Sequence, residues 1–261
     1  SATDVFVPAP VNSSVVSAGV PASVAGQLTA VTNAFAATEN LPGVQVAVYK
    51  AGEYDWTYAQ GDDLYGNPLD VYTAYDIASA TKSFTAALVW QAVDQGLIDP
   101  DAPLPRLAAV PSFPYYRQIT ARQLLAHTSG LANYRATTGY EENAKTLFTP
   151  EEAVKWAGQE PLQFWPGSHV AYSSTNYLVL GFLLEQVTGQ SYDDLLNRLL
   201  EEAGIFGAVH APAEVDLPNF STSGLMLTAN QLARWGTALL GDNTPQLSAE
   251  AIEAMTTIDV D

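Results

Sequence analysis

The chain has 261 residues, 48% of them hydrophobic and 10% aromatic, which is enough for a sizeable buried core. Its 28 acidic residues against 10 basic ones give a formal net charge of −18. This surface repels phosphate backbones and anionic lipid headgroups, so nucleic acid and membrane surfaces are excluded as expected partners. The chain has no cysteine and no run of 18 apolar residues, which excludes disulfides, thiolate chemistry and a membrane-inserted helix.

The N-terminal part is predicted to lead into a strand hairpin. Residues 1–20 are rich in Pro, Ser, Val and Ala and are expected to form an extended arm, followed by a helix from Pro21 to about Asn40. The stretch "GVQVAVYK" alternates as a strand does, and "EYDWTYAQG" is expected to pair with it. Because the chain opens without a basic start or an apolar core, we expect a secreted or periplasmic protein whose signal peptide has been removed.

Several helix boundaries follow in the remainder of the chain. The helix that carries "TKSFTAALVW" is expected to stop at Gly96. In "TARQLL" and "TPEEAVKW", Thr120 and Thr149 are predicted N-caps, each with Gln or Glu three residues later. "NYLVLGFLLEQVTG" is expected to end at Gly189, with Ser191 capping the next helix.

A serine and a lysine lie three residues apart in "DIASATKSFTAALVW". Ser79 and Lys82 share one face of the predicted helix, near its positive N-terminal end. A lysine in a dry pocket can be neutral and act as a base, because burial disfavours the ammonium form. Such a pair can activate the serine hydroxyl for acyl transfer.

The same pair has an ordinary structural interpretation. Serine is a common helix cap, and Ser-Xaa-Xaa-Lys is a short pattern that arises by chance. Phe84, Leu88 and Val93 indicate a buried helix, however, and a buried lysine needs a reason. These residues alone leave both interpretations open.

"WPGSHVAYSSTNYLVLG" supplies a second candidate. Tyr172 precedes a predicted helix by a few residues, and a loop tyrosine can relay protons when a nearby cation stabilises its phenolate. The alternative is a tyrosine that packs through its ring and hydrogen bonds to a backbone carbonyl. Metal or nucleotide cofactors are not expected, because His-Glu-Xaa-Xaa-His and glycine-rich phosphate motifs are both missing from the sequence.

Four segments, taken together, resemble the serine β-lactamase and penicillin-recognising superfamily. They occur in the family's order and are "DIASATKSFTAALVWQAVDQGLID", "ITARQLLAHTSGLANY", "PGSHVAYSSTNYLVLGFLLEQVTGQSY" and "SGLMLTANQLARWGTALL". The similar branch contains class C β-lactamases, D-alanyl-D-alanine carboxypeptidases, D-aminopeptidases and β-lactamase-like esterases. The resemblance implies an α+β fold, an antiparallel sheet flanked by helices with an inserted all-helical domain.

The resemblance also implies roles for particular residues. Ser79 corresponds to the acylated nucleophile, Lys82 to its base partner and Tyr172 to the tyrosine of the Tyr-Xaa-Asn motif. His127 lies in a loop of structural role. The family's asparagine is replaced by Ser174, a substrate-binding position in relatives. Because a hydroxyl is shorter and has fewer donors than an amide, this change favours the esterase branch over β-lactam or D-Ala-D-Ala turnover.

The family's third motif, Lys or His followed by a small residue and Gly, has no match in this chain, which ends "AIEAMTTIDVD". We therefore expect that a second chain or a cleaved C-terminal segment completes the sheet. The predicted domains are the arm at 1–20, an incomplete α/β domain from 21–97 and 223–261, and a mostly helical domain at 98–222.

The sequence predicts a serine hydrolase that cleaves a small-molecule or peptide amide or ester. Two alternatives stay open: a catalytically silent relative used for binding, and an acyltransferase with the same residues. Neither metal nor cofactor is expected in any of the three.

Overall fold

The computed structural model describes residues 12–241 and 246–257. These fall into two compact units, which we describe separately. The sheet unit comprises Ser1–Tyr75, Ala203–Ala208 and Leu227–Thr244, and the helical unit comprises Asp76–Glu202, Val209–Met226 and Pro245–Asp261. Within the described ranges, no helix is both long and apolar enough to cross a lipid bilayer.

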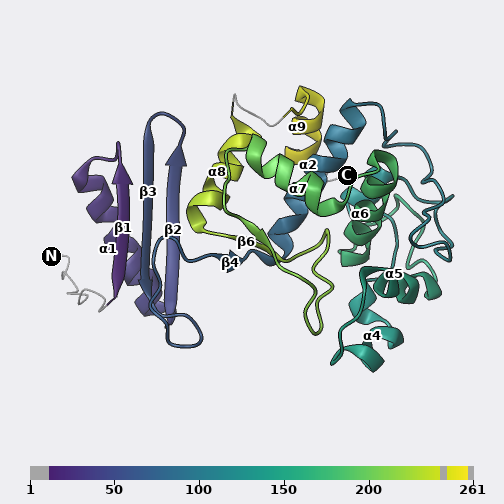
Figure 1. Cartoon of the computed structure of the whole chain (residues 1–261), viewed down its shortest axis with the longest axis horizontal. Helices are drawn as coiled ribbons and strands as arrows, with labels where there is room; N and C mark the ends of the chain where they lie inside the picture. Colours follow the sequence, from purple (N-terminus) through teal and green to yellow (C-terminus); the bar gives the residue numbers. More distant parts are fainter. Residues whose placement is uncertain (1–11, 242–245, 258–261) are drawn as a thin grey trace. The chain divides into compact units, whose positions relative to one another are not determined.

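The sheet unit is built on an antiparallel sheet of three strands in the order β1–β3–β2 (Figure 1). The strands are β1 (Ser13–Ala18), β2 (Gly43–Lys50) and β3 (Tyr54–Gly61). The two strands predicted as a hairpin are therefore confirmed. β1 lies within the stretch predicted to be an arm, where its six residues pair with Asp55 to Gln60 of β3.

Helices α1 (Ala22–Thr38) and α8 (Ala229–Leu240) pack against this sheet. Tyr58 of β3 donates its hydroxyl to Asn33 of α1. Asp55 lies on the other face of β3, because successive strand residues alternate, and it accepts hydrogen bonds from Asn230 and Arg234 of α8. The sheet is thus covered by a helix on each face.

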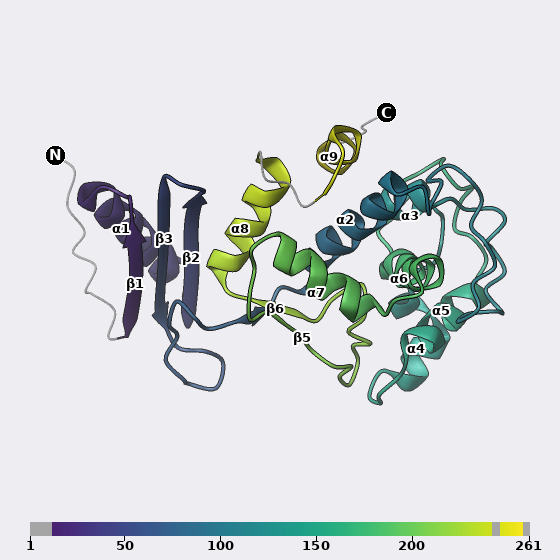
Figure 2. The same cartoon turned by 45° about the horizontal axis from the view of Figure 1, so that its top comes forward.

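The helical unit has α2 and α6 at its centre (Figure 2). Nearly every residue in the middle of α2 (Thr81–Asp94) and α6 (Ser174–Thr188) is buried. Because these helices are buried on nearly all sides, they have neighbours all round. Their neighbours are α3 (Ala121–Leu125), α5 (Pro150–Gln159), α7 (Tyr192–Glu202), α9 (Ala249–Thr256), and the 3-10 turns η1 (Ala78–Ala80) and η2 (Tyr134–Ala136). Helix α4 (Thr138–Asn143) packs against α5 and η2.

The predicted helix boundaries are confirmed. Thr120 and Thr149 both form complete capping boxes. Gly189 ends α6 in the left-handed conformation at φ 69°, which glycine adopts without a steric penalty. Ser191 accepts a hydrogen bond from the backbone N–H of Asp194 at the start of α7. Local chemistry therefore sets where these helices begin and end.

Three short strands form a second sheet in the order β4–β6–β5. They are β4 (Tyr75–Asp76), β5 (Val209–His210) and β6 (Leu225–Leu227). His210 pairs with Leu225 in the β5–β6 register. The chain passes from one unit to the other within β4 and within β6.

Candidate active site

Ser79 lies on the 3-10 turn η1, immediately before α2 and not within the α-helix itself. It follows Ala78, which has a positive φ of 47° that a non-glycine residue seldom adopts. The carboxylate of Asp76 holds this turn by accepting the backbone N–H of Ala78 at 2.7 Å. The turn leaves Ser79 exposed, as an attacking group must be.

Lys82 lies in the buried first turn of α2, and only 6% of its surface is exposed. Its Nζ lies 3.2 Å from Ser79 Oγ and donates to the backbone carbonyl of Thr222 at 2.9 Å. Burial lowers the pKa of Lys82, and the positive charge of Arg135 lowers it further, against an opposing effect of Tyr172. Lys82 therefore loses its proton more readily than a free lysine does, and its neutral amine can accept a proton from Ser79.

Tyr172 reaches the same serine from the loop that precedes α6. Its hydroxyl lies 2.7 Å from Ser79 Oγ, and its ring centroid lies 5.3 Å from Lys82 Nζ. Burial raises the pKa of Tyr172. The side-chain hydrogen bonds from Lys82, Ser79 and Ser174, with the charge of Lys82, outweigh that effect and lower the pKa below its usual value. Tyr172 is thus poised to release and regain a proton.

Ser174 is the first residue of α6, and its side chain hydrogen bonds to Tyr172. The structure therefore brings together all four residues singled out in the sequence: Ser79, Lys82, Tyr172 and Ser174. Their chemical roles remain predictions.

His127 packs beside the tyrosine, with its ring centroid 4.6 Å from that of Tyr172. Its Nδ1 accepts the backbone N–H of Ser173 at 3.2 Å and faces the side-chain amide of Asn176 at 3.1 Å. Burial lowers the pKa of His127 to about 4, and the charge of Lys82 adds to this effect. His127 is therefore neutral near pH 7, and its contacts with Ser173 and Asn176 connect it to the start of α6.

Sequence reasoning missed two contributors to the site. Thr222 acts through its backbone carbonyl, which leaves no signal in residue type, although it directly precedes the recognised "SGLML" segment. Arg135 follows the recognised "GLANY" segment and influences Lys82 by charge. Among the described residues, no three His, Asp or Glu side chains are grouped as metal ligands would be.

Comparisons with known proteins extend this description. Penicillin-binding protein 4 of Amycolatopsis lactamdurans is 32% identical over 182 residues, which are 67% of this chain and 46% of that protein. Esterase EstB of Burkholderia gladioli is 33% identical over 201 residues, 69% of this chain and 50% of that protein. This chain spans half or less of the length of these relatives.

A solved structure shows the same fold. The D-stereospecific amidohydrolase from Streptomyces sp. superposes with a TM-score of 0.70 at 26% identity, covering 91% of this chain and 78% of that one. The predicted α+β architecture is thereby confirmed. The family model described as Beta-lactamase matches residues 28–258. This chain therefore belongs to the beta-lactamase family.

Proposed function

We propose that this chain carries the catalytic centre of a serine hydrolase, which cleaves an amide or ester through an acyl-enzyme on Ser79. The observation that supports this most strongly is that Ser79 Oγ is within hydrogen-bond reach of two titratable groups, Lys82 Nζ and the Tyr172 hydroxyl. Both of these groups have a lowered pKa. A serine that only caps a helix bonds to backbone N–H groups and does not need a lysine amine and a tyrosine hydroxyl beside its Oγ.

In the acylation step, Ser79 Oγ attacks the substrate carbonyl carbon while its proton passes to the neutral Lys82 amine. A tetrahedral oxyanion forms, and we expect the backbone N–H of Ser79 to help stabilise it. The bond to the leaving amine or alcohol then breaks. The proton travels from Lys82 through Tyr172 to the leaving group, so that a neutral product departs.

Deacylation repeats these transfers with water as the nucleophile. Water attacks the Ser79 ester and loses its proton to the Tyr172–Lys82 pair, and the proton returns to Ser79 Oγ as the acid product leaves. Atoms and charges balance without a metal or a redox partner. The same residues would serve an acyltransferase, with an alcohol or amine in place of water.

The names of the relatives and the identity of Ser174 support a proposal for the substrate class. The relatives and structural neighbours are named as penicillin-binding protein, D-aminopeptidase, esterase and D-stereospecific amidohydrolase. We infer a small-molecule or peptide substrate with an ester or a D-amino-acid amide. Ser174 would contribute a single hydroxyl to substrate binding, which suits an ester better than an amide that needs paired donors.

We also propose that further strands, supplied by a C-terminal segment or by a second chain, pair with β2. In the described sheet β2 has β3 on one side only and stands at the edge. An unpaired edge has free backbone groups that accept another strand. Amide exchange along β2 should slow when the completing segment is present. Equal exchange with and without that segment would contradict this proposal.

The hydrolase proposal is tested with a panel of an activated ester, a D-alanyl-D-alanine peptide and a chromogenic cephalosporin. Ser79→Ala should abolish turnover of every compound that the parent cleaves. Ser83→Ala is the matched control, because Ser83 lies one turn further along α2 and bonds to the Ala80 carbonyl. Loss of activity in both variants, or in neither, would refute the role of Ser79.

Hydrolysis and acyl transfer are separated by the products. Running the reaction with competing alcohols or amino acids, at concentrations far below that of water, should leave the free acid as the main product. Ester or amide products in excess of the acid would identify an acyltransferase. Covalent labelling of Ser79 without turnover of any compound would identify a binding protein.

A further inference from the structure

The base Lys82 is supported by a short backbone segment that we call the strap, residues 221–224. Thr222 of the strap provides the carbonyl that receives Lys82 Nζ at 2.9 Å. The next-but-one residue, Gly224, donates its backbone N–H to Asp76, the carboxylate that also holds the turn before Ser79. The strap therefore contacts Lys82 directly, and it is linked through Asp76 to the turn that carries Ser79.

One end of the strap is fixed by the two central helices. Ser221 is fully buried and accepts the Thr85 hydroxyl of α2 at its carbonyl, at 2.7 Å. Its own hydroxyl donates to the carbonyl of Tyr177 in α6 at 2.6 Å. These contacts fix the position of Ser221. They do not involve the carbonyl of Ser223, which has a different hydrogen-bond partner.

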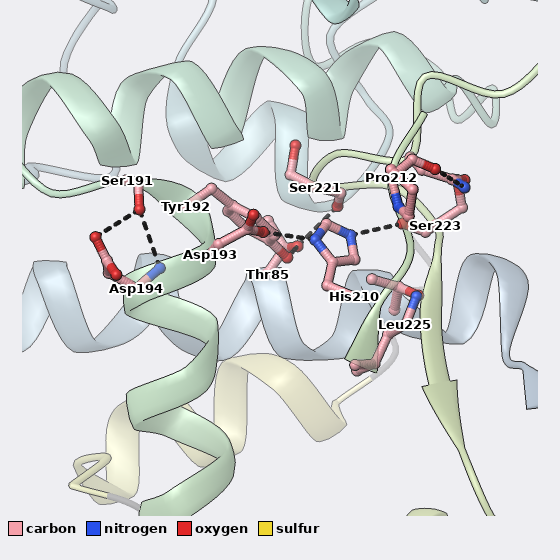
Figure 3. Close-up of polar contacts among 12 residues, drawn as sticks. Thr85, Ser191, Tyr192, Asp193, Asp194, His210, Pro212, Ser221, Ser223 and Leu225 are labelled. Atoms are coloured by element: carbon pink, nitrogen blue, oxygen red, sulfur yellow. Dashed lines mark hydrogen bonds and ion pairs between the residues drawn. The ribbon is translucent and has the colours of Figure 1, made fainter. Parts of the chain in front are cut away.

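That partner is His210 of β5 (Figure 3). Its Nε2 lies 3.0 Å from the Ser223 carbonyl, and its Nδ1 lies 2.6 Å from a carboxylate oxygen of Asp193 in α7. A carbonyl and a carboxylate only accept hydrogen bonds, so both contacts are satisfied together when both ring nitrogens carry a proton. The His210 side chain is 8% exposed, whereas that of Asp193 is 66% exposed.

We propose that His210 is a positioning residue for Lys82, acting through the strap. Its N–H holds the Ser223 carbonyl and thereby orients the adjoining peptide, whose Thr222 carbonyl receives the lysine amine. The expected change in the acylation rate of Ser79 rests on the proposed function. The expected change in the titration of Lys82 does not. The catalytic steps proposed above use Ser79, Lys82 and Tyr172, and they assign no role to His210, which lies in "VHAPA".

The chemistry of the contact predicts a direction of change. The partial negative charge of the Thr222 carbonyl favours the ammonium form of Lys82 over the amine. If the strap shifts, Lys82 loses this partner and its titration midpoint moves to lower pH. The amine is also no longer directed at Ser79 Oγ, so acylation slows even at a pH where Lys82 is fully neutral.

Two near-isosteric variants separate the two contacts of His210. In His210→Gln the amide nitrogen occupies the place of Nε2 and can still donate to the Ser223 carbonyl. In His210→Asn the amide nitrogen occupies the place of Nδ1 and can donate only toward Asp193. Ser191→Ala serves as the stability control, because it removes the cap of the same helix α7 without touching the strap.

The first measurement is the pH titration of Lys82 by NMR of the protein labelled with [¹³Cε]lysine. The chain contains four lysines, at positions 50, 82, 145 and 155, so the spectrum is simple and Lys82→Arg identifies the signal. His210→Asn should lower the midpoint of Lys82, while His210→Gln and Ser191→Ala should match the parent. This readout works whether or not the protein turns over a substrate.

The second measurement is the rate of acylation of Ser79 by a fluorophosphonate across pH. His210→Asn should react about tenfold more slowly at the plateau, with its acid limb displaced to lower pH. His210→Gln should stay within about threefold of the parent. Identical behaviour of the Gln and Asn variants, in both measurements, would overturn the proposal. A parent that shows no labelling refutes the proposed function instead, and the NMR titration then decides the role of His210.

Discussion

Two histidines in the helical unit show how hydrogen-bond partners decide what the same side chain can do. His127 receives N–H groups at Nδ1, from Ser173 and Asn176, and burial keeps it neutral with a pKa of about 4. His210 faces a carboxylate and a carbonyl, which both require it to donate. The first orders the loop that carries Tyr172, and the second holds the strap.

Lys82 connects two regions of the helical unit: the loop before α6 that carries Tyr172, here the loop region, and the strap of residues 221–224, here the strap region. Its Nζ lies over the ring of Tyr172 in the loop region and donates a hydrogen bond to the Thr222 carbonyl in the strap region. Because His127 is neutral, it adds no positive charge next to the lysine. The loop region is therefore suited to moving protons, and the strap region to holding the amine in place.

Lys82→Arg should remove both the proton transfer that the loop region supports and the amine that the strap region positions. The guanidinium keeps the positive charge but cannot be deprotonated, so it cannot serve as a base. We expect the acylation rate of Ser79 to fall about 10³-fold. Lys155→Arg, at an exposed position of α5, is the control and should leave the rate unchanged. An active Lys82→Arg variant would show that lysine is not the base.

Tyr172→Phe breaks the proton path of the loop region alone. The ring over Lys82 is kept and only the hydroxyl 2.7 Å from Ser79 Oγ is lost. We expect kcat to fall about 10²-fold, at the lower end for a general acid–base group, with KM little changed. Tyr177→Phe is the control: it removes a hydroxyl bonded to the Leu125 carbonyl and should cost about 1 kcal/mol of stability without lowering kcat.

Gly181→Ala perturbs the strap and the adjoining Phe220 from the side of α6. A Cβ at this position would overlap the Ser221 side chain and the Phe220 ring. Alanine is the better helix former by about 1 kcal/mol, so any loss must come from this overlap. We expect acylation to slow about tenfold, roughly the effect of displacing the strap by His210→Asn. Gly236→Ala in α8 meets no neighbouring atom and is the control; a normal rate in Gly181→Ala would weaken the role of the strap.

The free energy of unfolding should depend on pH in acid, because His127 is neutral in the folded protein. Its pKa is lowered from 6.5 to about 4, so between these values the unfolded chain binds the extra proton and the folded chain does not. Stability should therefore be complete above pH 6.5 and should decline toward pH 4, by at most about 1.4 kcal/mol per pH unit from this group. Urea unfolding across this range should show a flatter decline in His127→Asn than in the parent or in His169→Gln.

The elements with strong local signals were predictable. Alternating residues located the β2–β3 hairpin, and Thr120, Thr149, Gly189 and Ser191 marked helix ends. The fold class followed from four segments in the order of the family and is confirmed by the structural comparison. Features of this kind depend on residue type and on near neighbours in sequence.

The missed features depend on long-range backbone contacts. Thr222 serves Lys82 through a carbonyl 140 residues further along the chain, and any residue type has a carbonyl. His210 acts on the strap 13 residues away, where only the fold defines its partner. Likewise, the pairing of β1 with β3 joins polar and apolar residues without a clear alternation. The roles of Ser79, Lys82, Tyr172 and Ser174 stay predictions.

The most direct test of the central claim is the mass of an acid-quenched acyl-enzyme. The protein is mixed with a slowly deacylating activated ester, quenched within the first turnover, and mapped by peptide mass spectrometry. We predict a mass increase equal to the acyl group on the peptide that contains Ser79, lost in Ser79→Ala and delayed in Lys82→Arg. Steady turnover with the acyl group on another residue, or with no acyl-enzyme formed at any time, would contradict the account.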